Sequence, residues 1–69
     1  MTSEDKKRYN AIRYIVSNKY GYMDELIDAI SQKYVDEFIS LGFIHEGYTR
    51  KKKTWGCLEL AKQYYSVIN

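Results

Sequence analysis

The sequence lacks proline and contains one cysteine, Cys57, and one histidine, His45. A lone cysteine cannot form an internal disulfide, and one Cys with one His falls short of the four ligands of a structural zinc site. No apolar run approaches the roughly 20 residues that span a membrane, and no apolar signal segment is visible. We therefore expect a cytoplasmic protein that binds no metal or other cofactor and does not enter a membrane.

Catalytic motifs are missing as well. The chain has no glycine-rich phosphate loop, no nucleophile elbow and no Cys-His constellation. His45 alternates with the apolar Ile44 and should face solvent, whereas Cys57 fits a small buried apolar position. A pocket that encloses a substrate would consume most of the core of so short a chain. We expect no enzymatic activity and no catalytic residue.

The length, 69 residues, allows one domain spanning 1–69. A chain of this size buries only about 60% of its unfolded surface. Eight Tyr, two Phe and one Trp can offset this, because each large ring buries about 150 to 250 Å². Self-association would bury more surface, so a homodimer stands as an alternative to a monomer.

Charge is distributed unevenly along the chain. The net charge of +2 is too small to indicate a partner, but residues 1–21, 22–49 and 50–69 carry +3, −5 and +4. The last segment opens with four consecutive cations, Arg50 to Lys53. The protein is therefore basic at both ends and acidic in the middle.

Apolar residues at three- and four-residue spacing predict three helices in the first half of the chain. The first begins at a cap on Thr2 or Ser3 and ends at Gly21. The second spans Asp24 to Ile30 with Asp24 as its cap, and the third follows a cap on Ser31 and stops at Gly42. The last two helices, joined by a tight turn, form a helix-turn-helix.

A β-hairpin and a final helix follow. We expect a strand at Phe43–Tyr48, a basic tip at Thr49–Lys52 and a returning strand at Lys53–Cys57. The final helix is expected at Leu58–Val67. Glu46-Gly47 is a competing turn, which leaves the register open. Trp55 is expected in the core, although Tyr48 and Trp55 could alternatively stack on bases, and Tyr22 and Tyr34 are expected to be exposed.

This order of elements, with the step Leu-Gly-Phe-Ile at 41–44 into the hairpin and the segment Ala-Lys-Gln-Tyr-Tyr at 61–65, resembles a small winged helix-turn-helix DNA-binding domain. The resemblance covers nearly the whole chain at the level of the superfamily. It implies a mostly α protein with a small β-hairpin (α+β), made of three helices, a two-stranded wing and a C-terminal helix. It also implies that the third helix enters the major groove of duplex DNA while the wing touches the backbone or the minor groove.

Carried over by position, the resemblance implies a transcriptional regulator that binds double-stranded DNA. Its DNA-binding residues would be Gln32, Lys33, Arg50, Lys51, Lys52 and Lys53. Asp36 would lie beside Gln32 and Lys33, and the third helix also carries Glu37. Carboxylates at a DNA-facing surface oppose binding, because duplex DNA presents one negative charge per about 1.7 Å of its axis.

A second hypothesis therefore gives the winged helix a protein partner with a basic surface. The partner would meet an acidic face made of Asp24, Asp28, Asp36 and Glu37. One variant is an inhibitor from a phage or mobile element that occupies the cationic groove of a nucleic-acid-binding machine. Size and charge layout alone support this hypothesis, because a fold does not determine a function.

Overall fold

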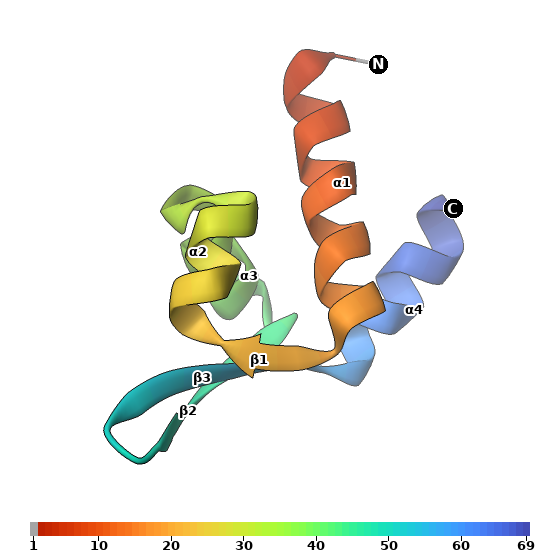
Figure 1. The fold of residues 1–69 in the computed structure, drawn as a ribbon. Coiled ribbons are helices and arrows are strands. Elements are labelled where there is room, and N and C mark those ends of the chain that lie inside the picture. Colours follow the sequence, from red (N-terminus) through yellow and green to blue (C-terminus); the bar gives the residue numbers. More distant parts are fainter. Residues whose placement is uncertain (1) are drawn as a thin grey trace.

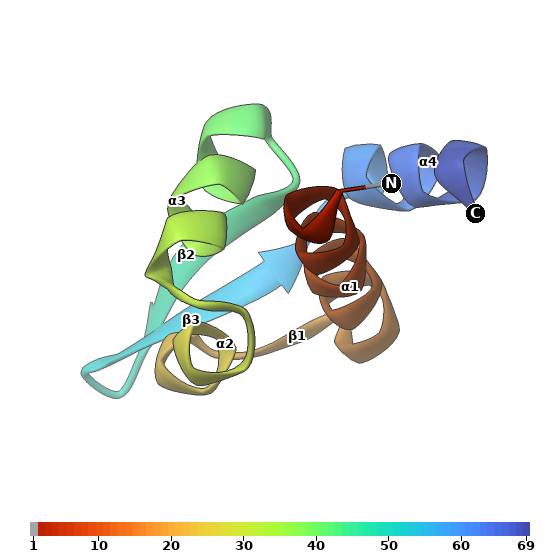
Figure 2. The same cartoon turned by 90° about the horizontal axis from the view of Figure 1, so that it is seen from above.

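A computed structural model describes residues 2–69, which form four helices and a three-stranded antiparallel sheet. The helices are α1 (Ser3–Asn18), α2 (Met23–Ile30), α3 (Gln32–Leu41) and α4 (Glu59–Ile68). The strands are β1 (Tyr20–Tyr22), β2 (Ile44–Thr49) and β3 (Lys52–Cys57), in the order β1-β3-β2. Helices α1, α2 and α3 lie on one side of the sheet, and the β2–β3 hairpin projects beyond them (Figures 1 and 2). The prediction of a mostly helical α+β protein is confirmed.

Helix α1 begins as predicted but ends early. The Thr2 hydroxyl accepts a hydrogen bond from the Asp5 amide at 3.1 Å. At the other end Lys19 takes a φ of 74°, and its amide closes the last turn on the Ile15 carbonyl. The chain then enters β1, so the prediction that Gly21 ends the helix is wrong. Gly21 instead lies against Trp55, where a Cβ would come within 3.1 Å of the indole nitrogen.

A single residue, Ser31, separates α2 from α3. It occupies the N-cap position of α3 as predicted, with a φ of 84°, but its hydroxyl makes no capping hydrogen bond. Asp24 is not the cap of α2, because the helix begins one residue earlier, at Met23. Gly42 ends α3 as predicted, in the left-handed conformation with a φ of 79°.

Register in the hairpin differs from the expected tip. Thr49 pairs with Lys52, which leaves only Arg50 and Lys51 in the loop, and no turn forms at Glu46-Gly47. Arg50 and Lys51 have φ values of 49° and 69°. Two-residue loops with positive φ at both positions match the right-handed twist of the flanking strands. The apex is therefore tighter than the sequence indicated.

The third strand, β1, was not predicted. It pairs with β3 opposite β2, so β3 is the central strand of the sheet. Helix α4 is shifted by one residue from the expected range, and it buries Ala61 completely. Among residues 2–69, no helix has both the length and the apolar character to cross a membrane.

One cluster of buried side chains joins the first three helices to the sheet. The largest fully buried members are Phe38, Ile12, Ile15, Leu26, Ile44 and Val35. Trp55 is 3% exposed, which confirms its place in the core. Tyr22 is exposed as expected, but Tyr34 is buried at 6% exposure, because it packs against Phe38 at a ring distance of 6.1 Å.

Replacing the loop residues with a better turn sequence should stabilise the protein. Most residues with a Cβ are strained at positive φ, whereas Asn and Gly adopt it readily. Arg50→Asn combined with Lys51→Gly should therefore raise the free energy of unfolding by about 1 kcal/mol. Urea denaturation measures it. Arg50→Gln with Lys51→Gln removes the same charges without relieving this strain, so a gain equal in both variants would contradict the two-residue loop.

Candidate nucleic-acid interface

The register of the hairpin divides the four consecutive cations. Lys53 pairs with Tyr48 and Lys52 pairs with Thr49. Successive side chains of a strand point to opposite faces of a sheet. Lys53 therefore lies on the face that carries the buried Trp55, which we call the helix-side face. Lys52 lies on the opposite, outer face.

Arg50 and Lys51 occupy the apex between these faces. Both are exposed, and neither makes an ion pair within the described residues 2–69. Lys53 is exposed as well, and its cross-strand partner Tyr48 is 71% exposed because this part of the hairpin lies beyond the helices. Arg50, Lys51 and Lys53 form what we call the wing-tip cluster. It can offer three ammonium or guanidinium groups to a polyanion.

Lys52 is held differently from the other three. Its ammonium nitrogen lies 5.0 Å from the centre of the Tyr22 ring. Such a contact is attractive because the face of the ring carries partial negative charge. The predicted DNA contact Lys52 is therefore directed toward β1, away from the wing-tip cluster.

The start of α3 is occupied by intramolecular contacts. Gln32 donates a hydrogen bond to the Asp36 carboxylate at 2.8 Å, and Lys33 forms an ion pair with Glu4 at the start of α1. Hydrogen bonds from Lys33 and Tyr34 lower the pKa of Glu4, and the same carboxylate raises the pKa of Lys33. Both predicted recognition side chains thus already have partners.

A second ion pair lies beside the first. Arg8 donates two hydrogen bonds to Glu37, from Nε to Oε2 at 2.8 Å and from the terminal nitrogen to Oε1 at 3.1 Å. The Glu37 carboxylate raises the pKa of Arg8 further above its ordinary value. The Arg8 and Lys33 cations lie 5.9 and 5.5 Å from the centre of the Tyr34 ring. Glu4, Arg8, Lys33, Tyr34 and Glu37 together form what we call the α1–α3 clasp.

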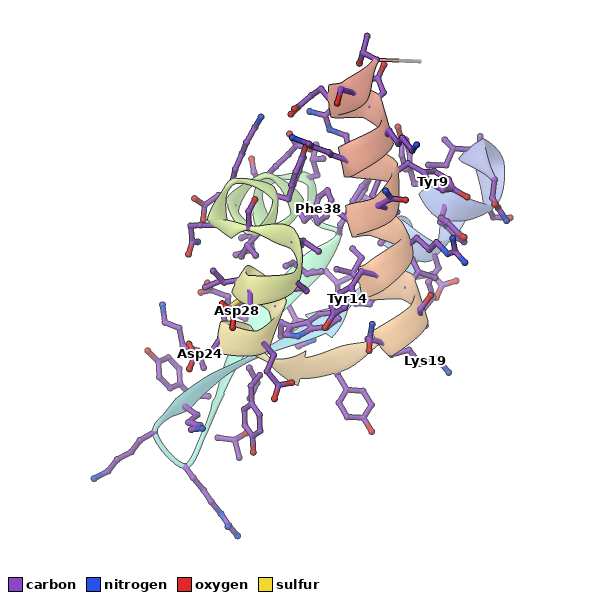
Figure 3. The ribbon with its side chains drawn as sticks, turned by 45° about the horizontal axis from the view of Figure 1, so that its top comes forward. Tyr9, Tyr14, Lys19, Asp24, Asp28 and Phe38 are labelled. Carbon is purple, nitrogen blue, oxygen red and sulfur yellow. The ribbon has the colours of Figure 1, made fainter. Side chains whose placement is uncertain are left out.

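The predicted acidic face is divided by this clasp. Asp24, Asp28 and Asp36 are exposed, and none makes an ion pair within residues 2–69. Figure 3 shows Asp24 and Asp28 on successive turns of α2. Glu37 is engaged with Arg8 instead, at the contact between α1 and α3. Asp24 and Asp28 are therefore open to a partner, whereas Asp36 already accepts a hydrogen bond from Gln32.

Sequence analysis missed strand β1, and with it the placement of Tyr20 and Tyr22 on one face of the sheet. Tyr20 and Tyr22 are 77% and 44% exposed on the outer face. The alternation of tyrosine and glycine in Tyr20-Gly21-Tyr22 is typical of a strand, but it is only three residues long.

The single histidine and the single cysteine of the chain do not form a site. His45 is exposed as expected, whereas Cys57 is only half-buried, and this burial raises the pKa of its thiol. Within residues 2–69 no three His, Cys, Asp or Glu side chains converge on a metal-sized site.

Comparison of the chain with protein-family models, curated proteins and solved structures found no match.

The clasp should make stability depend on pH through Glu4. The pKa of this carboxyl is lowered below its ordinary value of 4.5 in the folded state. Because this pKa is lower in the folded state than in the unfolded state, the Glu4 carboxylate stabilises the fold at pH values above about 4.5. The stabilisation is lost as the pH falls through the pKa of Glu4 in the folded state. Glu4→Gln should therefore lower the urea midpoint at neutral pH, and the gap to the unmodified protein should close on acidification. Wild-type and variant midpoints that differ equally at every pH would contradict the ion pair.

Proposed function

We propose that this chain is a winged helix-turn-helix protein, a small transcriptional regulator that binds double-stranded DNA chiefly through its wing. Helices α2 and α3, joined through Ser31, correspond to the helix-turn-helix, and the β2–β3 hairpin corresponds to the wing. The order of elements and the projection of the hairpin beyond the helices support this interpretation (Figure 1).

The observation that carries the proposal is the wing-tip cluster. Three exposed cations without an acidic partner in residues 2–69 lie at the projecting end of a two-stranded ribbon. Holding charges on such a ribbon limits the conformational entropy lost on binding. If Arg50, Lys51 and Lys53 each neutralise one phosphate, log affinity should fall with log salt at a slope of about −2.7, from about −0.9 per phosphate.

Helix α3 has a smaller role in this proposal. Gln32 and Lys33 reach bases only by exchanging Asp36 and Glu4 for DNA, so each new hydrogen bond to a base replaces one that the free protein already makes. Asp36 beside Gln32 also opposes close approach to phosphates. We therefore expect modest base specificity and strong salt dependence.

Neutralising the apex tests the wing. Arg50→Gln with Lys51→Gln should reduce the magnitude of the salt slope for a random duplex by about 1.8, because two phosphate contacts are lost. Lys62→Glu on α4 changes the net charge by the same amount at a distant exposed site and should leave the slope unchanged. Fluorescence anisotropy over a salt series measures both. Duplex binding that is equally affected by both variants would reject the wing as the contact.

We also propose that the regulator is a homodimer formed through α4. Leu60, Tyr64 and Val67 are 49%, 43% and 84% exposed, at the i, i+4, i+7 spacing of one helix face. The helix is anchored to the protein chiefly by Ala61 and Tyr65, and the Tyr64 ring also contacts Phe43 at a centroid distance of 5.3 Å. Two antiparallel copies of α4 would bring Leu60 of each chain against Val67 of the other. Such a self-complementary patch fits a two-fold interface.

Adding a charge to this stripe tests the dimer. Val67→Glu should weaken self-association at least about tenfold, since it places an unpaired carboxylate in an apolar contact. Ser66→Glu adds the same charge off the stripe and should have little effect. Sedimentation equilibrium measures both, and an unmodified protein that stays monomeric at high concentration would reject the interface.

The acidic surface supports a second candidate function, binding to the basic surface of another protein. Asp24, Asp28 and Asp36 are exposed and have no cationic partner within residues 2–69. An inhibitor from a phage or mobile element would use these groups to occupy a nucleic-acid-binding groove. Failure of duplex binding in the experiment on the apex would favour this candidate over the regulator.

A further inference from the structure

The outer face of the sheet has an unusual composition for an exposed surface. Pairing places eight residues on it, namely Tyr20, Tyr22, His45, Gly47, Thr49, Lys52, Thr54 and Gly56. None of them is acidic, although the chain has nine carboxylate side chains. Helices α1, α2 and α3 cover the opposite face, so this one is open to solvent (Figure 1).

Glycines on β2 and β3 keep the centre of the face shallow. A Cβ on Gly56 would lie 2.5 Å from the His45 Nε2 atom, and one on Gly47 would lie 2.9 Å from the Thr54 hydroxyl. Both distances are too short for ordinary contacts, so the two positions favour glycine. The His45 ring thus lies close over the backbone at Gly56, and no bulky side chain rises between it and β1.

Aromatic rings and a cation border this shallow centre. Tyr20 and Tyr22 lie two positions apart on β1, so their Cα atoms are about 6.7 Å apart, twice the 3.4 Å spacing of stacked bases. A surface hollow of about 390 Å³ lies between them and the threonines Thr49 and Thr54. The Lys52 ammonium group lies over the Tyr22 ring at the apex end of the hollow.

We propose that this outer face binds single-stranded nucleic acid, with unpaired bases stacked on Tyr20 and Tyr22. The Lys52 ammonium group would exchange the Tyr22 ring for a phosphate, and the apex cations would hold neighbouring phosphates. Stacking requires an exposed face of a base, which an intact duplex does not offer. The absence of carboxylates on the face removes the repulsion that opposes binding on α2 and α3. A second copy of this chain is a poorer occupant, because a contact between two identical outer faces would give Lys52 no acidic partner.

This site overlaps the one proposed for duplex DNA only at the apex, because Arg50 and Lys51 can serve both faces. Lys53 of the wing-tip cluster lies on the helix-side face, as does Tyr48. Single-strand binding can therefore be lost without loss of duplex binding. The two proposals can fail independently.

The test compares two exposed tyrosines on opposite faces. Tyr20→Ala should weaken binding of a short fluorescein-labelled oligo(dT) or oligo(rU) strand about 5- to 150-fold, the range expected for loss of one stacked base. Tyr20→Phe keeps the ring and should bind as the unmodified protein does. Tyr48→Ala is the matched control, because Tyr48 is 71% exposed on the other face, and its single-strand affinity should stay within about twofold of wild type.

The proposal is supported if the protein binds either oligonucleotide and only Tyr20→Ala loses affinity for it. The oligonucleotide that binds more tightly shows whether the preferred ligand is DNA or RNA. Absence of binding to both strands overturns the proposal. So does an equal loss for Tyr20→Ala and Tyr48→Ala, or a change from dimer to monomer on sedimentation of Tyr20→Ala. Tyr20→Ala should bind duplex DNA with the affinity of the unmodified protein. This measurement therefore separates the test of the outer face from the test of the wing.

Discussion

The pairing register of the β2–β3 hairpin is the constraint on which the rest of the structure depends. Side chains alternate across a sheet, so a shift of one residue would exchange the two faces along the whole hairpin. The observed register buries Ile44 and Trp55 against the helices. It also assigns Lys52 to the outer face and Lys53 to the helix-side face, and leaves Arg50 and Lys51 at the apex. Packing of the core and display of charge are thus set by the same two-residue loop.

The N-terminal half of the protein is organised by the α1–α3 clasp. Exposed ion pairs contribute little on their own, but here two pairs flank the buried Tyr34 ring and share its surface. The clasp uses Lys33, the only cation on α3, and Glu37, one of its carboxylates. Helix α3 is therefore tied to the body of the protein and has no free cation to offer a phosphate, whereas the hairpin tip has three cations without an ion pair within residues 2–69. This distribution is the physical reason for assigning nucleic-acid contacts to the sheet side of the molecule.

Sequence alone identified the helical segments, the hairpin and the burial of Trp55, because apolar spacing and Gly42 are strong local signals. It missed β1, since three residues carry too little periodicity, and a strand at that place is stabilised by pairing with β3 far along the chain. It misplaced the apex, since Arg50 and Lys51 are not the residues that two-residue loops prefer. The partners of Lys33 and Glu37 could not be predicted either, because Glu4 and Arg8 lie 29 residues away in the sequence.

These contacts also changed the candidate sites. Four adjacent cations suggested one positive prong, whereas pairing separates them into a cluster of three and a lysine held over Tyr22. Tyr34 was expected on the surface, but its hydroxyl donates a hydrogen bond to Glu4 at 2.9 Å and its ring is buried. The role proposed for Tyr20 and Tyr22 depends on their place beside β3, which only the structure makes visible.

The central claim is that nucleic acid meets the hairpin and not the acidic helices. Titration of ¹⁵N-labelled protein with a random DNA duplex, followed by amide chemical shifts, tests it most directly. We predict that the largest shifts fall on residues 48–53, with small changes in α2. Shifts that concentrate on α2 and α3 and spare the hairpin, or no shifts at low salt, would contradict it.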